Sequence, residues 1–372
     1  MRILAICNTP YQMLCIVNLK MYTFQDDEMD IIVSDHTMRS EQLVKAVKTC
    51  GLFTRSYHAK TFDYCRRLGR YKNISRKEFY SKSLIENILP IDVSYDLLLL
   101  NNVDPFADRL YEKCSQINSG IKVFAFEDGY ATYSFNFYGD SIKHIREAAF
   151  SKREKLLSLL YGKKQVANYI DKLFAFSPEK MDWDPPFEVQ RMPLISRDDL
   201  RMKQIFNDIF SYNSAKETYD TKYIFFEECY RREGTILPDV LLLEIISSWV
   251  GKENIMVKVH PRSGNDLFEK LGYKVNHETS IPWEVICMNE NILEDKILIT
   301  ISSGCVSTPY TVMGLPVKSI VLQNLLYGIG ENQLGLYHQW LDKYIYQQAT
   351  DLFYLPNTLD ELKSILTKNI FK

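Results

Sequence analysis

Short apolar runs that end in polar turns recur along the first half of the chain. Residues 1–7 form such a run, and apolar residues with helical spacing follow it over 12–21. Later runs of the same kind occupy residues 30–33, 97–100, 121–126 and 172–176. Polar or helix-like stretches separate these runs, so the pattern predicts a parallel sheet whose strands alternate with helices.

This alternation breaks after residue 177, where prolines and a charged segment over 197–216 interrupt it. A second series of strand and helix patterns begins at residues 223–226. It continues with a helix over 238–250 and with strands over 254–259, 297–301 and 317–322. The second half of the chain therefore repeats the architecture of the first.

The break predicts two α/β domains. We expect the first over residues 1–177, a linker region over 178–220 and the second over 221–357. The last segment, 358–372, has a helical pattern and is expected to cross back onto the first domain. A chain of 372 residues, 46% of them hydrophobic, is long enough for each domain to bury its own core.

Charge and loop composition limit the partners. The 45 basic and 47 acidic side chains nearly cancel, and no long run of one sign occurs, so we expect no nucleic-acid partner. No Gly-x-Gly-x-x-Gly follows the first strand, and no Gly-Lys-Ser/Thr loop occurs. The usual dinucleotide and P-loop phosphate cradles are therefore excluded, and a nucleotide must be bound in another way.

The cysteines and the apolar runs bear on location. The eight cysteines are scattered and form no Cys-x-x-Cys pair, which indicates reduced thiols and neither a disulfide framework nor a zinc site. No apolar run reaches the roughly twenty residues that span a bilayer. Residues 1–6 are too short for the apolar part of a signal peptide. We expect a cytoplasmic protein that rests at most on the inner membrane.

An acidic pair follows the strand predicted over 121–126. Glu127 and Asp128 precede Gly129, so their carboxylates emerge at the carboxyl edge of the sheet, where open α/β sheets bind ligands. A carboxylate there can take a proton from an acceptor hydroxyl. The alternative is that Asp128 and Gly129 only form a turn.

Basic residues end the strand predicted over 254–259. Alternation directs Lys258 and His260 to one face, and Pro261 ends the strand. Together with Arg262 they suit a phosphate or a leaving group that gains negative charge. The alternative is an ordinary surface histidine beside an arginine.

Two further motifs lie downstream. Glu284 follows Pro282 at the start of a predicted helix, where it can accept hydrogen bonds from a ribose diol or only complement the helix dipole. Ser302 and Ser303 follow the strand predicted over 297–301, where hydroxyl and backbone N–H groups can bind an anion without a metal. The alternative for Ser302 is a helix N-cap.

In this order, the four motifs resemble those of bacterial sialyltransferases, which carry an acidic pair with glycine, then a His-Pro, then paired serines. The resemblance is strongest to glycosyltransferase family 52, the lipooligosaccharide sialyltransferases, whose first strand also leads into a Thr-x-x-Gln turn, here Thr9 to Gln12. Residues 281–285 also resemble the Ile-Pro-Phe-Glu-Val motif of marine bacterial sialyltransferases. Glu127 stands where many members have Asp, and residues 227–230 match no motif with confidence.

The resemblance implies a GT-B fold, with two Rossmann-like domains that face each other across a nucleotide-sugar cleft. Asp128 would be the general base, with Glu127 and Gly129 shaping its loop, and His260 would assist the departing phosphate. The other implied roles are phosphate binding by Ser302 and Ser303, cytidine binding by Lys258, Pro261 and Glu284, and a place in the acceptor loop for Thr9 and Gln12.

The implied activity is inverting transfer of sialic acid from CMP-sialic acid to a terminal galactoside of a lipooligosaccharide or capsule, with a lipid-linked acceptor. Fixed donors can stabilise the CMP leaving group, so neither a metal nor a cofactor is expected. The alternatives are a GT-B enzyme that uses CMP-Kdo or a UDP-hexose, a UDP-sugar epimerase and a glycan-binding protein without activity. The acceptor, the α2,3 or α2,6 linkage, the number of sialic acids added and the oligomeric state are left open.

Overall fold

The computed structural model divides into two compact units. Met1–Pro193 with Asp208–Phe210 form the first unit, and Leu194–Asn207 with Ser211–Lys372 form the second. The structure describes residues 1–37, 39–61, 92–134, 165–212, 219–228, 238–261, 266–290, 295–326, 339–341, 343–349 and 351–368.

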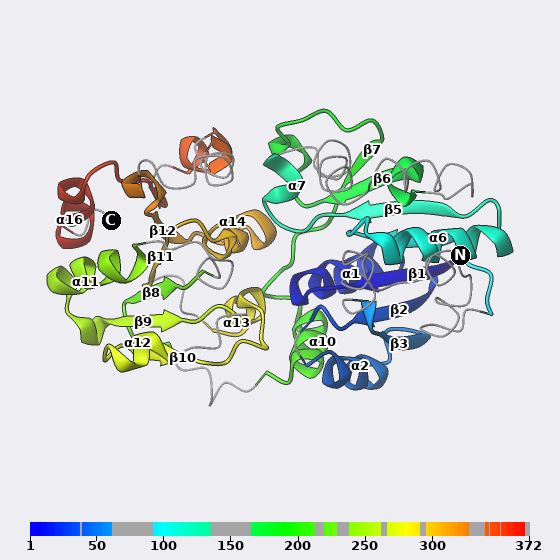
Figure 1. The fold of residues 1–372 in the computed structure, drawn as a ribbon, viewed down its shortest axis with the longest axis horizontal. Helices are drawn as coiled ribbons and strands as arrows, with labels where there is room; N and C mark the ends of the chain where they lie inside the picture. The colour runs from blue at the N-terminus through cyan, green and yellow to red at the C-terminus, as the bar shows by residue number, and fades with distance from the viewer. Residues whose placement is uncertain are drawn as a thin grey trace, which may run out of the picture. The chain divides into compact units, whose positions relative to one another are not determined.

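The described part of the first unit holds a seven-stranded, wholly parallel sheet in the order β3-β2-β1-β4-β5-β6-β7 (Figure 1). Its strands are β1 (Arg2–Cys7), β2 (Glu28–Ser34), β3 (Arg55–Ala59), β4 (Leu97–Leu100), β5 (Lys122–Phe126), β6 (Ile170–Ala175) and β7 (Glu188–Arg191). The described helices between Met1 and Pro193 are α1 (Pro10–Tyr22), α2 (Ser40–Thr49), α6 (Pro105–Ile117), α7 (Ala131–Ser134) and the 3-10 helices η1 (Val166–Tyr169) and η2 (Pro178–Lys180).

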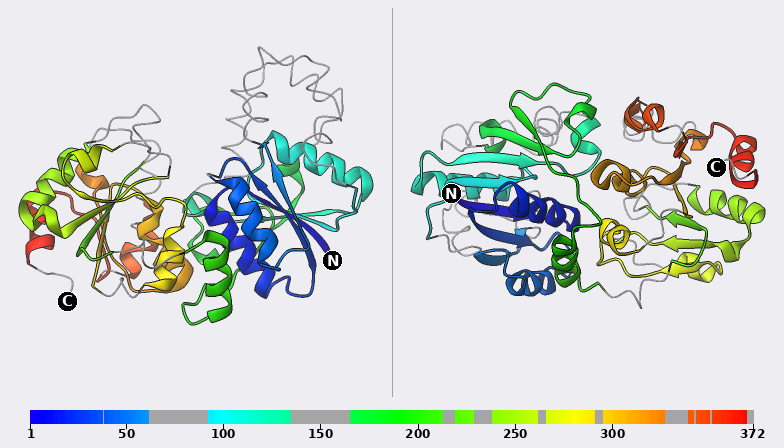
Figure 2. Two further views of the ribbon diagram at one scale, coloured as in Figure 1. Left: turned by 90° about the horizontal axis from the view of Figure 1, so that it is seen from below. Right: turned by 180° about the vertical axis from the view of Figure 1, so that it is seen from behind.

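The chain first runs outward from β1 through β2 to β3 and then returns to the other side of β1 with β4. Right-handed crossovers place α1 and α2 on one face of the sheet and α6 on the other, as Figure 2 shows. The carboxyl ends of β1 and β4 therefore flank a topological switch point, where open α/β sheets bind ligands.

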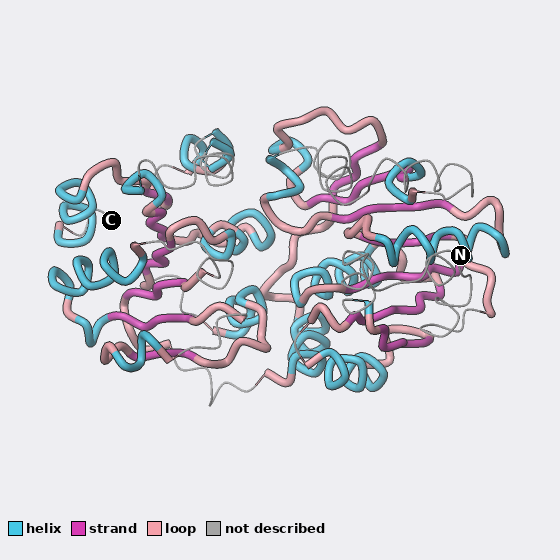
Figure 3. Tube along the Cα trace, viewed as in Figure 1, coloured by secondary structure: helices cyan, strands magenta, loops and turns pink. Residues whose placement is uncertain are grey.

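The described part of the second unit holds a six-stranded parallel sheet in the order β10-β9-β8-β11-β12-β13. Figure 3 shows the strands of both units in magenta and the helices that accompany them in cyan. Its strands are β8 (Tyr223–Phe226), β9 (Ile255–Lys258), β10 (Lys274–Asn276), β11 (Ile297–Thr300), β12 (Lys318–Val321) and β13 (Phe353–Tyr354). Its helices are α11 (Asp239–Val250), α12 (Leu267–Lys270), α13 (Trp283–Asn289), α14 (Thr308–Met313), α16 (Leu359–Thr367) and the 3-10 helices η3 (Lys252–Asn254), η4 (Gly304–Val306), η5 (Gln323–Leu326) and η6 (Tyr346–Gln348). Helix α10 (Leu200–Phe210) lies in the segment where the chain changes unit. In this sheet the switch point lies between β8 and β11.

The predicted pair of parallel-sheet α/β domains is thus confirmed. The central strands read as continuous apolar runs because they are covered on both faces, and every residue of β4 and of β8 is buried. Helix α16 adds Leu362, Ile365 and Leu366 to the core of the second unit. The return of residues 358–372 to the first domain stays a prediction.

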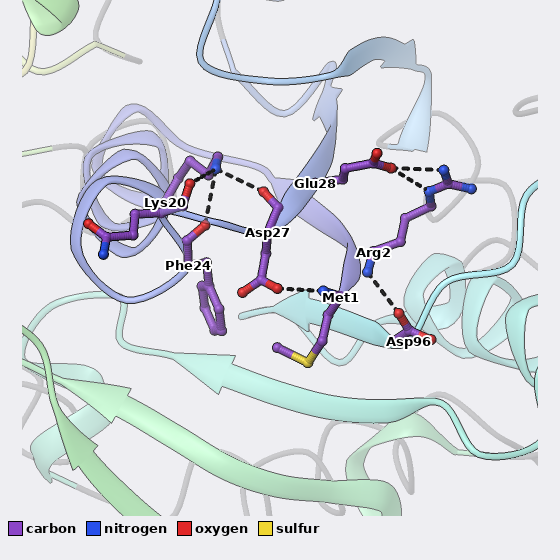
Figure 4. A network of polar contacts seen from close by, with 8 residues as sticks. Met1, Arg2, Lys20, Phe24, Asp27, Glu28 and Asp96 are labelled. Carbon is purple, nitrogen blue, oxygen red and sulfur yellow. Dashed lines mark hydrogen bonds and ion pairs between the residues drawn. The ribbon is translucent and has the colours of Figure 1, made fainter.

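Charged groups gather where β1 begins, at the amino edge of the first sheet. The Met1 ammonium donates to Asp27 at 2.5 Å, and the Arg2 guanidinium binds Glu28 at 2.8 and 2.9 Å (Figure 4). The Arg2 N–H also donates to the Asp96 carboxylate at 2.8 Å. These contacts are exposed and lie at the amino ends of the strands, whereas the motifs of interest follow the carboxyl ends.

Candidate active site

Helix α1 begins directly after β1, and Thr9 is its N-cap. The Thr9 hydroxyl accepts from the Gln12 N–H at 3.1 Å, which satisfies one of the free donors of the first turn. The Gln12 side chain is fully buried, and its Oε1 accepts from the Asn8 N–H at 2.8 Å. Because a backbone N–H can only donate, this bond sets the orientation of the Gln12 amide.

The Gln12 amide nitrogen therefore faces three acceptors from the neighbouring strands. Its Nε2 lies 2.9 Å from Asn102 Oδ1, 3.3 Å from Asn101 Oδ1 and 3.1 Å from Asp128 Oδ2. Asn101 is held in turn by its bond to the Phe126 carbonyl at 2.7 Å. The loops after β1, β4 and β5 thus meet at the switch point around one buried amide.

Glu127 is the enclosed member of the acidic pair. Its Oε1 accepts from the Tyr11 hydroxyl at 2.5 Å, and its Oε2 accepts from the Tyr133 hydroxyl and from the Phe176 N–H at 2.7 Å. The side chain is buried, and this burial raises the pKa of Glu127 to about 7, although the hydrogen bonds act in the opposite direction. Glu127 therefore joins α1, α7 and the end of β6.

Asp128 is only partly buried and lies on a tight turn. Gly129 has φ +75°, a left-handed conformation that favours glycine, and the Asp128 N–H donates to the Thr132 hydroxyl at 2.9 Å. Burial raises the pKa of Asp128, while bonds from Gln12 and Thr9 lower it by a smaller amount. Of the two acids, Asp128 is the one placed to meet a ligand, and a raised pKa suits a general base.

The second unit collects its motifs at the carboxyl edge in the same way. The Lys258 ammonium, at the end of β9, donates to the Tyr219 hydroxyl at 3.2 Å and to the Glu278 carbonyl at 3.1 Å. Lys258 is only 8% exposed. Protein acceptors thus surround this buried cation, and a bound base would have to share it with them.

His260 is half-buried, and its backbone N–H donates to Glu227 Oε2 at 3.0 Å. Pro261, which follows it, is exposed. Glu227 comes directly after β8, the strand next to β9, and is itself buried. The Glu227 carboxylate, at the end of β8, therefore fixes the backbone of the His-Pro loop at the end of β9.

The paired serines lie on the other side of β8, after β11. Ser302 donates its hydroxyl to Glu228 Oε2 at 2.7 Å and its N–H to Glu228 Oε1. Ser303 is the N-cap of η4, where its hydroxyl accepts from the Cys305 N–H at 3.4 Å. The N-cap is thus Ser303, and Ser302 is joined to a carboxylate.

Glu284 lies in the first turn of α13 and is 5% exposed. Its Oε1 accepts from the Thr308 hydroxyl at 2.5 Å. Burial raises the pKa of Glu284, and the Thr308 bond and the Lys258 charge lower it by smaller amounts. Glu284 thus combines a first-turn position, where it complements the helix dipole, with a buried bond to α14.

Each unit therefore assembles the residues that the sequence singled out. The first brings together Thr9, Gln12, Glu127, Asp128 and Gly129. In the second, Lys258 ends β9, Glu284 lies in the first turn of α13, and the loops after β9 and β11 carry His260, Pro261, Ser302 and Ser303. Arg262 lies outside the described residues.

Sequence reasoning missed several partners. In the first unit these are Asn8, Tyr11, Asn101, Asn102 and Tyr133, and in the second they are Tyr219, Glu227, Glu228 and Thr308. Asn101, Asn102, Glu227 and Glu228 each follow a strand predicted from the apolar pattern. Polar residues directly after such strands were the signal that could have found them.

The described residues contain neither a candidate metal cluster nor a candidate membrane-spanning helix. No group of three or more His, Cys, Asp or Glu side chains in this part of the chain is arranged to hold a metal ion. Among the same residues, no helix has both the length and the apolar character that a bilayer crossing requires.

Two parallel-sheet α/β domains, each with polar loops at the switch point of its sheet, define the GT-B fold. Solved structures of this class are similar over nearly the whole chain. An α/β-galactoside α-2,3-sialyltransferase of Photobacterium phosphoreum has a TM-score of 0.51 and 13% identity, over 95% of this chain and 98% of that one. Spinosyn forosaminyltransferase SpnP has a TM-score of 0.53 and 12% identity, over 100% and 92% of the two chains. The calicheamicin glycosyltransferase CalG4 has a TM-score of 0.52 and 10% identity, over 100% and 90%.

The sequence identifies the family within this class. Residues 3–321 match the alpha-2,8-polysialyltransferase family, and the chain belongs to it. No curated protein sequence matches. The sialyltransferase character inferred from the motifs is supported. The match is to the polysialyltransferase family, so it does not support the narrower assignment to glycosyltransferase family 52, the lipooligosaccharide sialyltransferases.

Proposed function

We propose that this glycosyltransferase moves sialic acid from CMP-sialic acid to the end of an α2,8-linked sialic acid chain. The family that matches residues 3–321 suggests this acceptor, in place of the galactose terminus implied by the motif resemblance. A galactoside is the second acceptor to test, because the similar Photobacterium enzyme is named for one. We place the reaction at the cytoplasmic face of the inner membrane, on a lipid-linked glycan.

One observation carries the proposal. The His-Pro loop and the Ser-Ser loop flank β8 at the switch point of the second sheet, and adjacent carboxylates after β8 bind both of them. This is where a nucleotide binds in a doubly wound sheet. His260 and the Ser302–Ser303 turn then hold the phosphate, and Glu284 and Lys258 lie on the cytidine side.

In the proposed reaction Asp128 takes the proton from the acceptor hydroxyl as that oxygen attacks the anomeric carbon. The bond from that carbon to the CMP oxygen breaks, and CMP leaves with the electron pair. Donors at His260 and the serine turn stabilise the new charge, so the step needs no divalent metal. A direct displacement of this kind inverts the anomeric carbon.

The test is a donor and acceptor screen in excess EDTA. CMP-sialic acid, CMP-Kdo and UDP-sugars are each incubated with an oligosialic acid and with lactose, and product mass and released nucleotide are read. We expect transfer from CMP-sialic acid to oligosialic acid without metal. Transfer only from another donor, loss of all activity on chelation or product on lactose alone contradicts the corresponding part of the proposal.

The Asp128→Asn variant belongs in the same assay. Because it keeps the shape of the side chain but cannot accept the proton, turnover should fall by about two to four orders of magnitude, with CMP affinity unchanged. His260→Ala should both lower turnover and weaken CMP binding, since it removes a contact to the leaving group. A folded Asp128→Asn enzyme with wild-type turnover would exclude Asp128 as the base.

A further inference from the structure

Glu228 belongs to a segment that matched no motif, yet it binds Ser302, the first of the paired serines, directly. We propose that Glu228 is a positioning residue of the donor phosphate site and that it acts through Ser302. This inference rests on the proposed function, because it concerns the same CMP-binding edge of the second sheet.

Three donors, from the last residue of β11 and from Ser302 beyond it, converge on the Glu228 carboxylate. Its Oε1 accepts from the Ser302 N–H and, at 3.1 Å, from the Thr300 hydroxyl, and its Oε2 accepts from the Ser302 hydroxyl at 2.7 Å. Hydrogen bonds to an ionised acceptor are among the stronger ones, and two oxygens that bind one residue also fix its direction. Glu228 therefore determines how the chain leaves β11.

The same contacts define what Ser302 can do. A hydroxyl has one proton, and Ser302 gives it to Glu228 Oε2, while its only backbone N–H goes to Oε1. Both donors of Ser302 are thus used inside the protein, so Ser302 has no donor left for a phosphate. Its contribution is to hold the turn that begins with Ser303.

The same network of hydrogen bonds around Glu228 also holds the Ser303 end of the turn. The Ser303 N–H donates to the Thr300 hydroxyl at 3.0 Å, and that hydroxyl gives its own proton to Glu228. A chain of bonds therefore runs from the carboxylate through Thr300 to Ser303. In this arrangement Ser303 and its turn meet the phosphate, and Glu228 sets their place.

A double-mutant cycle on CMP affinity tests the inference. Wild type, Ser302→Ala, Glu228→Ala and the double variant are titrated with CMP by calorimetry, and the melting temperature of each is recorded. We expect Glu228→Ala to weaken CMP binding by about 10- to 100-fold. Ser302→Ala should weaken binding in the wild-type background but have no further effect once Glu228 is absent.

Two variants separate positioning from general loss of structure. Glu228→Gln should restore most of the affinity, because its amide oxygen still accepts from the Ser302 N–H and its NH₂ can donate to the Ser302 hydroxyl. This variant also keeps the test valid if Glu228→Ala does not fold. Glu269→Ala removes an exposed glutamate of the same unit, with a side chain 64% exposed, and should bind CMP as wild type does.

Each outcome is decisive. If Ser302→Ala weakens CMP equally with and without Glu228, Ser302 binds the phosphate itself and the inference is wrong. It is also wrong if folded Glu228→Ala binds CMP as tightly as wild type. If the wild-type protein binds no CMP, the proposed donor is wrong, and the inference is wrong with it. Because the other two results require a wild-type protein that binds CMP, the two failures are distinguishable.

Discussion

Glu127 and Asp128 are neighbours in the sequence, yet the fold gives their carboxylates different surroundings. Glu127 accepts three hydrogen bonds inside the first unit, whereas Asp128 is partly exposed and is bound by Gln12. Proton transfer needs access to the acceptor hydroxyl, so the partly exposed Asp128 suits the role of general base. The enclosed Glu127 suits the role of holding the loop in place. At this scale, hydrogen-bond partners separate two roles that the shared motif does not.

The buried acid makes stability depend on pH. Burial raises the pKa of Glu127 to about 7, above its ordinary value of 4.5. Between these values the unfolded chain has lost the proton and the folded one keeps it, so the free energy of unfolding falls as pH rises. At about 1.4 kcal/mol per pKa unit, the fall is on the order of 3 kcal/mol, is absent at low pH and is complete above neutral pH.

Glu127→Gln should remove this part of the pH dependence. Its amide oxygen can still accept from the Phe176 N–H, and its NH₂ can donate to the Tyr11 hydroxyl. Urea unfolding of both proteins at about pH 5 and about pH 8 measures the difference. The free energy of unfolding of the variant should rise relative to that of wild type as pH rises. Equal pH dependence in the two proteins would show that Glu127 is not a buried acid of raised pKa.

At the scale of elements, the loop after β5 relies on its turn. Gly129 has φ +75°, and an added Cβ there would meet nothing within 4 Å, so a substitution is opposed by backbone strain alone. The turn carries Asp128 from β5 toward α7, and the Asp128 N–H bond to Thr132 depends on it. Strain at this turn should therefore affect both stability and the placement of the base.

Gly129→Ala should lower the free energy of unfolding by about 1 kcal/mol and reduce turnover. Gly120→Ala is the matched control, because its φ is not in the left-handed range and its Cβ would make an ordinary 3.5 Å contact with Asn118. We expect the control to change stability by less than about 0.5 kcal/mol. Urea unfolding and transfer rates check both, and a Gly129→Ala protein as stable and active as the control would contradict the role of the turn.

At the scale of the whole molecule, two units with separate sheets each carry one set of candidate site residues. The first holds Asp128 and the Gln12 cluster, and the second holds His260, Glu284 and the serine turn. In both sheets the order of the strands reverses after the first three, and this reversal creates a switch point. Each set of residues lies at the switch point of its own sheet. This division assigns the acceptor to the first unit and the donor to the second in the proposed reaction.

Hydrogen exchange with and without CMP tests the division. CMP should slow exchange most in peptides that cover 223–228, 255–261 and 297–307, because bound nucleotide suppresses local opening around its site. Peptides of the first unit, such as 1–37, serve as the internal comparison and should change less. Protection that is strongest in the first unit would contradict the assignment of the donor to the second.

The sequence by itself was sufficient to predict two parallel α/β domains, to place three of the motifs at the ends of strands and to place Glu284 at the start of a helix. Apolar periodicity and the turn residues that follow it are local properties, so they can be read along the chain. The separation of Glu127 from Asp128 could not be read in this way. It depends on Tyr11, 116 residues away, and on Phe176, 49 residues away.

The tertiary structure alone decided the partners across strands. Glu228 and Ser302 are 74 residues apart and meet because β8 and β11 are neighbours in the sheet. The Lys258 ammonium likewise binds Tyr219 and the Glu278 carbonyl, so protein groups already share a cation that the motif alone would offer to a ligand. Strand order is set by packing and not by periodicity, which is why the residues of each motif were predictable and their partners were not.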